Sequence, residues 1–351
     1  MLVSVCIAFF LCVCCTPPLI ALCKKKNWYD KPNPRKLHQS SIPRLGGVTV
    51  FAAFIVAVLI YIFLFAKENY FFALPLFFGM LVIFFGGLAD DFSNLHARIK
   101  LLIQIATALI VAVSPLYLKD LLGFRVPMLV GRVCTFMWII AIINAFNLID
   151  GLDWLCGGIA FLVLVTIGII FRCYGLEAGN LCFVLCGALL GFLIFNHPPA
   201  KIFIGDCGSQ TLGYIIAVSP LLGSASVFDD IKPLVMILLI ALPGTDVVAA
   251  IWRRTRDHRS LFSTDRAHIH HKFINIGFSK NATIFFLLFL QALTCGAALG
   301  LVFMPDKKTT LILFGVTLAL LWILFGTIHY VNRSVNMRLH GHLDAAPQEE
   351  Y

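Results

Sequence analysis

The fold is decided by the stretch Val133-Cys-Thr-Phe-Met-Trp-Ile-Ile-Ala-Ile-Ile-Asn-Ala-Phe-Asn-Leu-Ile149, which contains no charged residue. A helix needs about 20 mostly apolar residues to cross the hydrocarbon core of a bilayer, and stretches of nearly that length recur along the whole chain. Hydrophobic residues make up 60% of the 351 residues, and only 13% are charged. Because soluble domains carry about 25% charged residues, this chain cannot cover a water-facing surface, and the sequence predicts a membrane protein.

The predicted class is all-α, a polytopic integral membrane protein with about eleven transmembrane helices. The alternating pattern that a membrane β-barrel requires is absent. We expect one membrane domain over residues 1–335 and a short polar tail over 336–351. The predicted spans are 2–22, 45–66, 70–89, 101–118, 133–149, 157–172, 179–196, 209–225, 233–251, 282–303 and 309–330.

The basic residues predict the orientation. No basic residue precedes the first span, whereas Lys24, Lys25 and Lys26 follow it directly, the reverse of the charge order in a secretory signal peptide. The N-terminus is therefore expected outside, and the C-terminus in the cytoplasm. With alternating loops, those inside carry 19 of the 27 Lys and Arg residues. The net charge of +9 then reflects topology and contact with anionic lipid rather than nucleic-acid binding.

The other polar residues gather in five of the inside loops. Ionisable groups at membrane helix ends are costly unless they serve a site, so we expect one assembled site at the cytoplasmic face. The clusters are Asp30 with Asn33 and His38, Asp90 with Asp91, Asn144 to Asp153, Asn196 to Asp206, and Asp246 to His271.

Two of these clusters are rich in oxygen ligands. Asp90 and Asp91 are adjacent carboxylates, which repel each other unless a cation or a proton intervenes. They suit Mg²⁺ or phosphate handling, with a solvated helix end as the alternative. Lys100 opens the next helix, where it can meet phosphate. The series Asn144, Asn147, Asp150 and Asp153 recurs every three residues and offers hard oxygen ligands for Mg²⁺.

Two further clusters suit phosphate binding. In the run 201–209, Gly205 and Gly208 flank Asp206 just before an apolar helix. A helix N-terminus offers free N–H groups to phosphate, although a simple glycine-rich turn explains this run too. The run Arg266-Ala-His268-Ile-His270-His271 lies in the most basic loop. Its histidines fit phosphate or zinc ligands, although no cysteine completes a tetrahedral zinc site, and a lipid-contacting basic loop is the third alternative.

Taken together, six runs resemble the polyprenyl-phosphate N-acetylhexosamine-1-phosphate transferase family, in order and in approximate spacing. The His-Ile-His-His run is similar to the bacterial branch that starts O-antigen, enterobacterial common antigen or teichoic acid lipids. Two residues depart from the family pattern, Trp154 at a position that is usually Gly, and Cys207 at one that is commonly Ala or Val. The matching runs are Asp30-Lys-Pro-Asn-Pro-Arg-Lys-Leu-His38, Ile42-Pro-Arg-Leu-Gly-Gly47, Asp90-Asp91, Asn144-Ala-Phe-Asn-Leu-Ile-Asp-Gly-Leu-Asp153, Phe203-Ile-Gly-Asp206-Cys-Gly-Ser209 and His268-Ile-His-His271.

The resemblance implies transfer of a sugar 1-phosphate from a UDP-N-acetyl sugar to undecaprenyl phosphate, with release of UMP. UDP-GlcNAc is the expected donor, and UDP-GalNAc or a 6-deoxy sugar is the alternative. Mg²⁺ is the expected cofactor, with Mn²⁺ as a substitute. The expected location is the bacterial inner (plasma) membrane, with membrane lipid as a partner, no nucleic acid, and a homodimer left open.

The resemblance also assigns roles to residues. The catalytic group would be Asp90, Asp91, Asp150 and Lys100, where Asp90 and Asp91 position the lipid phosphate. Mg²⁺ would be held by Asp206 and Asn147. The nucleotide would contact Phe203, stacked on uracil, together with Asn196, Asp153 and Gly205. Phosphate charge would be neutralised by Arg266, His268, His270 and His271, and the loop serving the acceptor would contain Asp30 and Arg44.

Three alternatives stay open from the residues. Direct displacement and a covalent aspartyl-phosphate intermediate are both compatible with the carboxylates. An anion transporter would place its charges near the middle of the bilayer in broken helices, whereas here they gather at helix ends. An intramembrane prenyltransferase would need two full acidic motifs, and the segment after Asp91 lacks a third acidic residue.

Overall fold

The computed structural model describes residues 1–29, 42–65, 73–222, 226–258, 260 and 268–340. Two predicted site residues, Asp30 and Arg266, lie outside the described residues. Within the described part of the chain the elements are helices, apart from a hairpin of β1 (Asp120–Leu121) and β2 (Phe124–Arg125). The prediction of an all-α polytopic membrane protein is confirmed.

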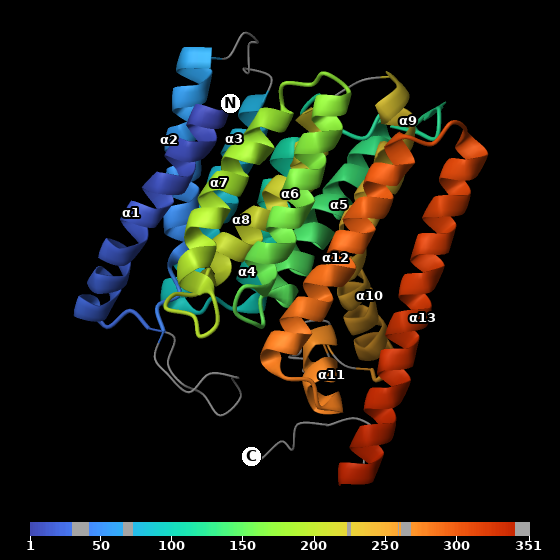
Figure 1. The fold of residues 1–351 in the computed structure, drawn as a ribbon. Helices are drawn as coiled ribbons and strands as arrows, with labels where there is room; N and C mark the ends of the chain where they lie inside the picture. The colour runs from blue at the N-terminus through green and yellow to red at the C-terminus, as the bar shows by residue number, and fades with distance from the viewer. Residues whose placement is uncertain (30–41, 66–72, 223–225, 259, 261–267, 341–351) are drawn as a thin grey trace.

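The helices form one bundle (Figure 1). In chain order they are α1 (Leu2–Lys26), α2 (Gly46–Phe65), α3 (Leu74–Ser93), α4 (Ala97–Ala112), α5 (Met128–Ile149), α6 (Leu155–Cys173), α7 (Gly179–Asn196), α8 (Gly205–Val218), a 3₁₀ helix (Ser219–Leu222), α9 (Ser226–Leu239), α10 (Ala241–Arg256), α11 (Ile269–Ile276), α12 (Lys280–Val302) and α13 (Lys307–His340).

Ten of the eleven predicted stretches fall largely on one helix each, and the stretch 233–251 is divided between α9 and α10. The helices also differ in length. Eight helices among the described residues are long and apolar enough to cross a membrane, and α9 with α10 would make a ninth span bent by 73°. The helices α4 and α8 have 16 and 14 residues, fewer than the roughly 20 of a full crossing. The count of eleven crossings and the orientation of the termini therefore stay predictions.

The bend at Ile240 has a cause in the sequence. Pro243 lies in the first turn of α10, four residues after Leu239, the last residue of α9. A proline ring clashes with the carbonyl group four residues earlier and has no N–H to donate. A single straight helix over 233–251 is therefore interrupted, and α10 leaves in a new direction.

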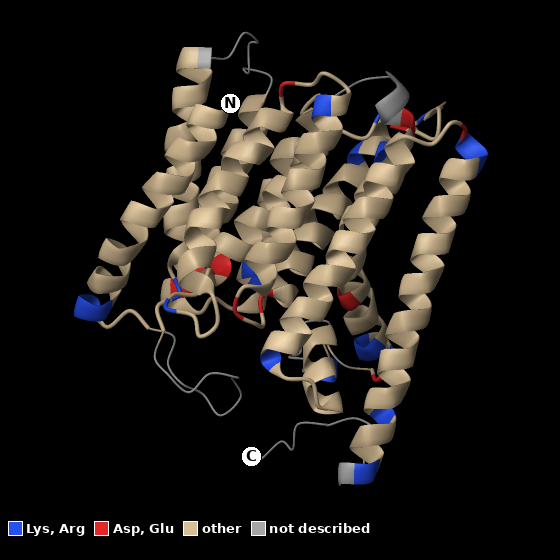
Figure 2. Cartoon of the chain, in the orientation of Figure 1, with Lys and Arg blue, Asp and Glu red and all other residues tan. Residues whose placement is uncertain are grey.

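The centre of the bundle is formed by α6 and α7. In the apolar 18-residue stretch of each, 72% of the residues are buried within the protein, compared with 17% in the corresponding stretch of α1 and 11% in that of α13. A helix that is hydrophobic on all sides and buried belongs to the interior, whereas α1 and α13 present apolar side chains to lipid. Lys, Arg, Asp and Glu lie at the two ends of the bundle, with an uncharged band between them (Figure 2).

Close backbone contacts fix the start of α8 against α2 and α3. A Cβ atom added to Gly47 would collide with Gly208, and one added to Gly87 would collide with the backbone of Cys207. Small residues allow membrane helices to approach this closely. The N–H groups of Gly46 and Gly47 also donate to the carbonyls of Phe203 and Ile204, at 2.9 and 2.8 Å. The first turn of α8 is therefore held firmly at one end of the bundle.

Candidate active site

A carboxylate from α3 caps the N-terminus of α8. One oxygen of Asp91 accepts from the N–H of Asp206 at 2.8 Å, and the other accepts from the N–H of Cys207 at 3.0 Å. The residue before them, Gly205, has φ +74°, and a Cβ there would collide with the carbonyl oxygen of Arg44. The resemblance assigned Asp91 to positioning the lipid phosphate. In the structure both of its oxygens accept from backbone N–H groups in the first turn of α8.

Asp90 is more deeply buried than its neighbour and faces two groups. It is 1% exposed. One of its oxygens accepts from the N–H of Leu95 at 2.8 Å, and the other forms an ion pair with Lys100. The Lys100 ammonium also lies 3.8 Å from Asp206 Oδ2. Asp90 and Lys100, predicted as catalytic residues, therefore lie beside Asp206, the predicted metal ligand, between α3, α4 and α8.

Asp206 is the point where the predicted motifs meet. Its Oδ2 lies 3.4 Å from Arg44 Nη2, and its Oδ1 accepts from Asn147 Nδ2 at 2.5 Å. Asn147 also donates to Ser209 at 3.3 Å. Four segments that are far apart in the sequence, from the loop before α2 to α8, thus converge on one carboxylate.

The series with a spacing of three residues does not act as one ligand set. Asn144 donates to Gln104 of α4 at 2.7 Å, and Gln104 donates to Gln210 of α8 at 3.4 Å. Asp150 ends α5, and Asp153 accepts from the N–H of Ala200 at 3.1 Å. The first member of the series connects α4, α5 and α8, and the last accepts from a backbone N–H in the loop between α7 and α8. Asn147 is the member that contacts Asp206 directly.

Beside Asp206 lies a cavity of about 540 Å³, which we call the donor cavity. Nine of the predicted site residues line it. These are Arg44, Asn147, Asp150, Asp153, Asn196, Phe203, Gly205, Asp206 and His271. Five other predicted site residues among those described are not part of its wall: Asp90, Asp91, Lys100, His268 and His270.

One wall of the donor cavity is braced through Asn196 and Trp154. Asn196 accepts from the N–H of Trp154 and donates to the carbonyl of Ile202, both at 2.8 Å. Trp154 has φ +68°, a left-handed conformation that glycine adopts most easily, and its indole N–H donates to Leu193 at 3.1 Å. This conformation gives a physical reason for the glycine that is usual at this position in the family.

The three histidines occupy three different environments. His268 is 6% exposed, and its Nδ1 lies 3.0 Å from Asp246 Oδ2. His270 is 1% exposed and packs against Gly151. Burial lowers the pKa of His270 to about 3, so this ring is neutral. Only His271 reaches the donor cavity, and the run therefore does not act as three equivalent phosphate ligands.

The structure adds Asp246, Lys280 and Asn281 to the candidate site. Asp246 is 5% exposed, and its second oxygen accepts from the N–H of Ile269, the first residue of α11, at 3.0 Å. Lys280 and Asn281 begin α12 and line the donor cavity. Asp246 belongs to a polar cluster visible in the sequence, whereas a single Lys-Asn pair before an apolar span carries no distinguishing pattern.

The donor cavity offers the chemistry of a magnesium site. Asp206 and Asp150 supply carboxylates, and burial together with the charge of Asp206 raises the pKa of Asp150 to about 8, which a nearby cation would reverse. Among the described residues no group of three His, Cys, Asp or Glu side chains could hold a metal, so the zinc alternative gains no support there. Mg²⁺ usually binds one or two carboxylates, with waters and substrate phosphates completing its shell, and this donor set fits it.

Comparisons with known proteins agree with the motifs. The family profile of glycosyl transferase family 4 matches residues 73–224. A probable undecaprenyl-phosphate N-acetylglucosaminyl 1-phosphate transferase of Bacillus subtilis is 33% identical over 288 residues, which cover 77% of this chain and 76% of the relative.

Two relatives from other bacteria show the same likeness. The undecaprenyl-phosphate alpha-N-acetylglucosaminyl 1-phosphate transferase of Escherichia coli K12 is 32% identical over 79% of this chain and 77% of its own length. The protein of that name from Yersinia pestis is 32% identical over 84% and 81%. Likeness over most of both lengths, together with the ordered motifs around Asp206, shows that this chain is a membrane enzyme of glycosyl transferase family 4, the sugar-1-phosphate transferases.

Proposed function

We propose that this enzyme transfers GlcNAc 1-phosphate from UDP-GlcNAc to undecaprenyl phosphate and releases UMP. The names of the relatives give the acceptor, undecaprenyl phosphate, and the transferred group, N-acetylglucosaminyl 1-phosphate. The observation that carries the proposal is the position of Asp206, at a capped helix start, with Arg44 and Asn147 beside it and the donor cavity in front. Phosphoryl transfer needs mainly positioning and charge stabilisation, and this arrangement offers both.

The donor would occupy the donor cavity. Its volume of about 540 Å³ lies within the range of about 300–1,000 Å³ for small-molecule sites. Phe203 would stack on uracil, and His271 with Lys280 would face the sugar or the pyrophosphate. Asn196 supports the wall through backbone hydrogen bonds, so we assign it to shaping the pocket rather than to reading the base.

Mg²⁺ would be held by Asp206, with Asn147 next to it, and would neutralise the pyrophosphate. Asn147 now directs its amide nitrogen to Asp206, so the amide would need to turn to present its oxygen to the ion. Mg²⁺ supplies charge stabilisation to the leaving UMP. Arg44 and Lys100, at 3.4 and 3.8 Å from Asp206 Oδ2, would balance the remaining charge.

The acceptor would approach from the side of Asp90 and Lys100. A phosphate monoester has a second pKa near about 6, so its oxygen is already largely deprotonated at neutral pH and needs little help from a base. That oxygen would attack the phosphorus that carries GlcNAc. The bond from this phosphorus to the oxygen of UMP would break, and UMP would leave with the electron pair.

We place the reaction at the cytoplasmic face of the bacterial inner membrane. The support is the distribution of basic residues at the end of the bundle that carries the site. Lys24, Lys25 and Lys26 lie in the last turn of α1, and Arg253, Arg254 and Arg256 lie in the last turn of α10. UDP-sugars are soluble and the prenyl chain is not, so both substrates can meet only at a membrane surface. A cysteine at position 44, on the rim of the donor cavity, should react only with reagents on the cytoplasmic side.

The test is transfer of radiolabel by the purified protein in detergent with undecaprenyl phosphate and Mg²⁺. UDP-GlcNAc, UDP-GalNAc and UDP-MurNAc-pentapeptide would be compared as donors. We expect a lipid-extractable product from UDP-GlcNAc, equimolar UMP, and loss of activity with EDTA. A product from UDP-GalNAc alone would reject the proposed sugar, and no product from any UDP-sugar in folded protein would reject the reaction.

A further inference from the structure

Three amide side chains, which we call the amide triad, connect α4, α5 and α8 inside the bundle. Asn144 Nδ2 donates to Gln104 Oε1 at 2.7 Å, and Gln104 Nε2 donates to Gln210 Oε1 at 3.4 Å. Gln104 and Gln210 are only 4% and 3% exposed. No member of the triad is among the described residues that line the donor cavity. The triad therefore acts on the site, if at all, through the helices that it joins.

The amide triad lies one helical turn from the charged groups around Asp206. Residues three or four positions apart lie on the same side of a helix, and four residues advance about 6 Å along its axis. Each member shares its helix face with a residue at the end of the helix, and the pairs are Gln104 with Lys100 on α4, Asn144 with Asn147 on α5, and Gln210 with Asp206 on α8. The triad thus forms a second polar layer, deeper in the bundle.

The three helices are not held to one another equally firmly. The contact between α5 and α8 is a close backbone approach, because a Cβ atom added to Gly213 of α8 would collide with the backbone of α5. In contrast, α4 packs against α3 and α5 and reaches α8 through side chains, with Lys100 near Asp206 and Gln104 hydrogen-bonded to Gln210. Loss of Gln104 should therefore release α4 and leave α5 and α8 in contact.

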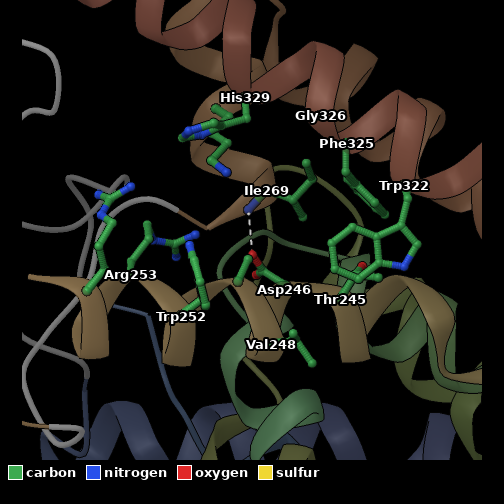
Figure 3. Close-up of a pocket in the computed structure, with 13 residues that line it drawn as sticks. Thr245, Asp246, Val248, Trp252, Arg253, Ile269, Trp322, Phe325, Gly326 and His329 are labelled. Atoms are coloured by element: carbon green, nitrogen blue, oxygen red, sulfur yellow. Dashed lines mark hydrogen bonds between the residues drawn. The ribbon is translucent and has the colours of Figure 1, made fainter.

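Hydrogen bonds between helices hold another part of the site as well. Figure 3 shows the N–H of Ile269 in α11 donating to Asp246 of α10. In the interior of a membrane protein no water replaces a lost partner, so such a bond favours the one arrangement of the helices that pairs its polar atoms. A shift of α4 along its axis would separate the Gln104 amide from both of its partners.

We propose that Gln104 is a positioning residue that holds Lys100 beside Asp90 and Asp206. Lys100 forms an ion pair with Asp90 and lies 3.8 Å from Asp206 Oδ2, where its charge can also meet the phosphates of the substrates. A misplacement of about 1 Å caused by a distant substitution can lower a rate about 100-fold. The kinetic part of this inference rests on the proposed transfer reaction.

The first test is the variant Gln104→Met, which keeps the length of the side chain and removes both hydrogen bonds. We expect kcat to fall about 10- to 100-fold, because Lys100 is no longer held at the two carboxylates. The KM for the UDP-sugar should stay unchanged, because no described residue of α4 lines the donor cavity. The Mg²⁺ concentration at half-maximal rate should also stay unchanged, because Asn147 and Asp206 lie on the two helices that remain packed.

The matched control is Asn180→Leu. Asn180 is 6% exposed and donates to Tyr61 at 2.7 Å, so it joins α7 to α2 at the end of the bundle away from the site (Figure 1). Each substitution removes a buried hydrogen bond between membrane helices, so both should lower the melting temperature by similar amounts. Only Gln104→Met should lower kcat. Equal losses of kcat in the two variants would show that Gln104 acts through stability, and would overturn the proposal.

A second measurement does not depend on the reaction. The Lys100 side chain is 30% exposed, so a small acetylating reagent can reach its amine, and the ion pair with Asp90 slows the modification. Peptide mass spectrometry after brief acetylation should show faster labelling of Lys100 in Gln104→Met than in the unaltered protein or in Asn180→Leu. Equal labelling would overturn the proposal. Absence of transfer by the unaltered protein would instead reject the proposed function, and labelling would still decide the role of Gln104.

A milder variant guards against a failure of Gln104→Met to fold. Gln210→Met removes one of the two hydrogen bonds of Gln104 and leaves the other, to Asn144, in place. It should show a smaller loss of kcat and a smaller increase in the labelling of Lys100. Unchanged kcat together with unchanged labelling in folded Gln210→Met would contradict the role of the amide triad.

Discussion

Two helices near the active site, α8 and α11, each have an aspartate that caps the N-terminus, but the surroundings of the two caps differ. Asp91 caps α8 and orients Asp206, whereas Asp246 caps α11 and holds His268. Asp91 gives both oxygens to backbone N–H groups, while Asp246 gives one to the backbone and one to a side chain. The start of α8 is also enclosed by glycine contacts with α2 and α3, whereas α11 lies between α12 and the lipid-facing helix α13.

The comparison teaches that a carboxylate near a reaction centre can act through the backbone. By sequence alone Asp90 and Asp91 form one acidic pair, but only Asp90 keeps an oxygen on the cation Lys100. Substitutions at the firmly packed start of α8 should therefore abolish most of the activity. Substitutions at the start of α11 should leave part of it. The substitutions below test this difference, from the largest expected effect to the smallest.

The largest effect is expected at Asp206, whose backbone N–H is held by the Asp91 cap of α8. Asp206→Asn removes the carboxylate and keeps its size, so kcat should fall by a factor of about 1,000, the upper range for the loss of one stabilising group. The Mg²⁺ concentration at half-maximal rate should rise. Activity and Mg²⁺ titration of the purified variant measure both, with the melting temperature as a control for folding. Full activity with unchanged Mg²⁺ dependence would remove Asp206 from the metal site.

Breaking the cap itself should affect stability and rate together. Asp91→Ala leaves two buried N–H groups without an acceptor, which should lower the free energy of unfolding by about 1–3 kcal/mol. A displaced Asp206 should then reduce kcat about 100-fold, as misplacement of a catalytic group by about 1 Å can do. Thermal unfolding and kinetics are measured on the same sample. A loss of rate with unchanged stability would instead assign Asp91 to the acceptor phosphate, as the sequence suggested.

The α11 cap should give a smaller and separable effect. Asp246→Asn weakens the hydrogen bond between this side chain and His268. As a result kcat should fall about 10- to 100-fold, the loss expected when the hydrogen-bond partner of a functional histidine is mutated. Because the two side chains act as one unit, Asp246→Asn in a His268→Gln background should cost little more. A double variant whose losses multiply would show that Asp246 does not act through His268.

A variant in the wall of the donor cavity tests binding rather than orientation. Phe203→Ala should raise the KM for the UDP-sugar about tenfold, since stacking on one base contributes about 1–3 kcal/mol. The Mg²⁺ dependence should stay unchanged, in contrast with Asp206→Asn. Kinetics with varied donor and inhibition by UMP measure the effect. An unaltered KM would exclude uracil stacking on this ring.

The smallest effect is expected at Trp154. Glycine at φ +68° relieves about 1 kcal/mol of backbone strain but loses the indole hydrogen bond, worth about 1 kcal/mol. Trp154→Gly should therefore change stability by less than about 1 kcal/mol. Trp154→Ala keeps the strain and loses the bond, so it should unfold at a lower temperature than Trp154→Gly. The reverse order would show that a Cβ at this φ is not strained.

Sequence reasoning selected residues that the structure brings together, but it did not show which group each of them contacts. The motifs that converge on Asp206 were recognised in order, and nine of the predicted residues line one cavity. Asn144 and Asp91 were treated as ligands, but the structure engages them with Gln104 and with backbone N–H groups. Which neighbour a polar side chain meets depends on contacts between distant segments, and a spacing along one helix cannot show them.

The sequence by itself determined the membrane class, the polar clusters at helix ends and the family, because hydrophobic length and motif order are local properties of the chain. Tertiary structure alone decided that α10 turns by 73° from α9, that His270 is neutral and buried while His271 reaches the donor cavity, and that Lys280 joins the site. The physical reason is that the burial of a side chain and the pairing of its charge depend on the segments that pack against it. For these residues, those segments are distant in the sequence.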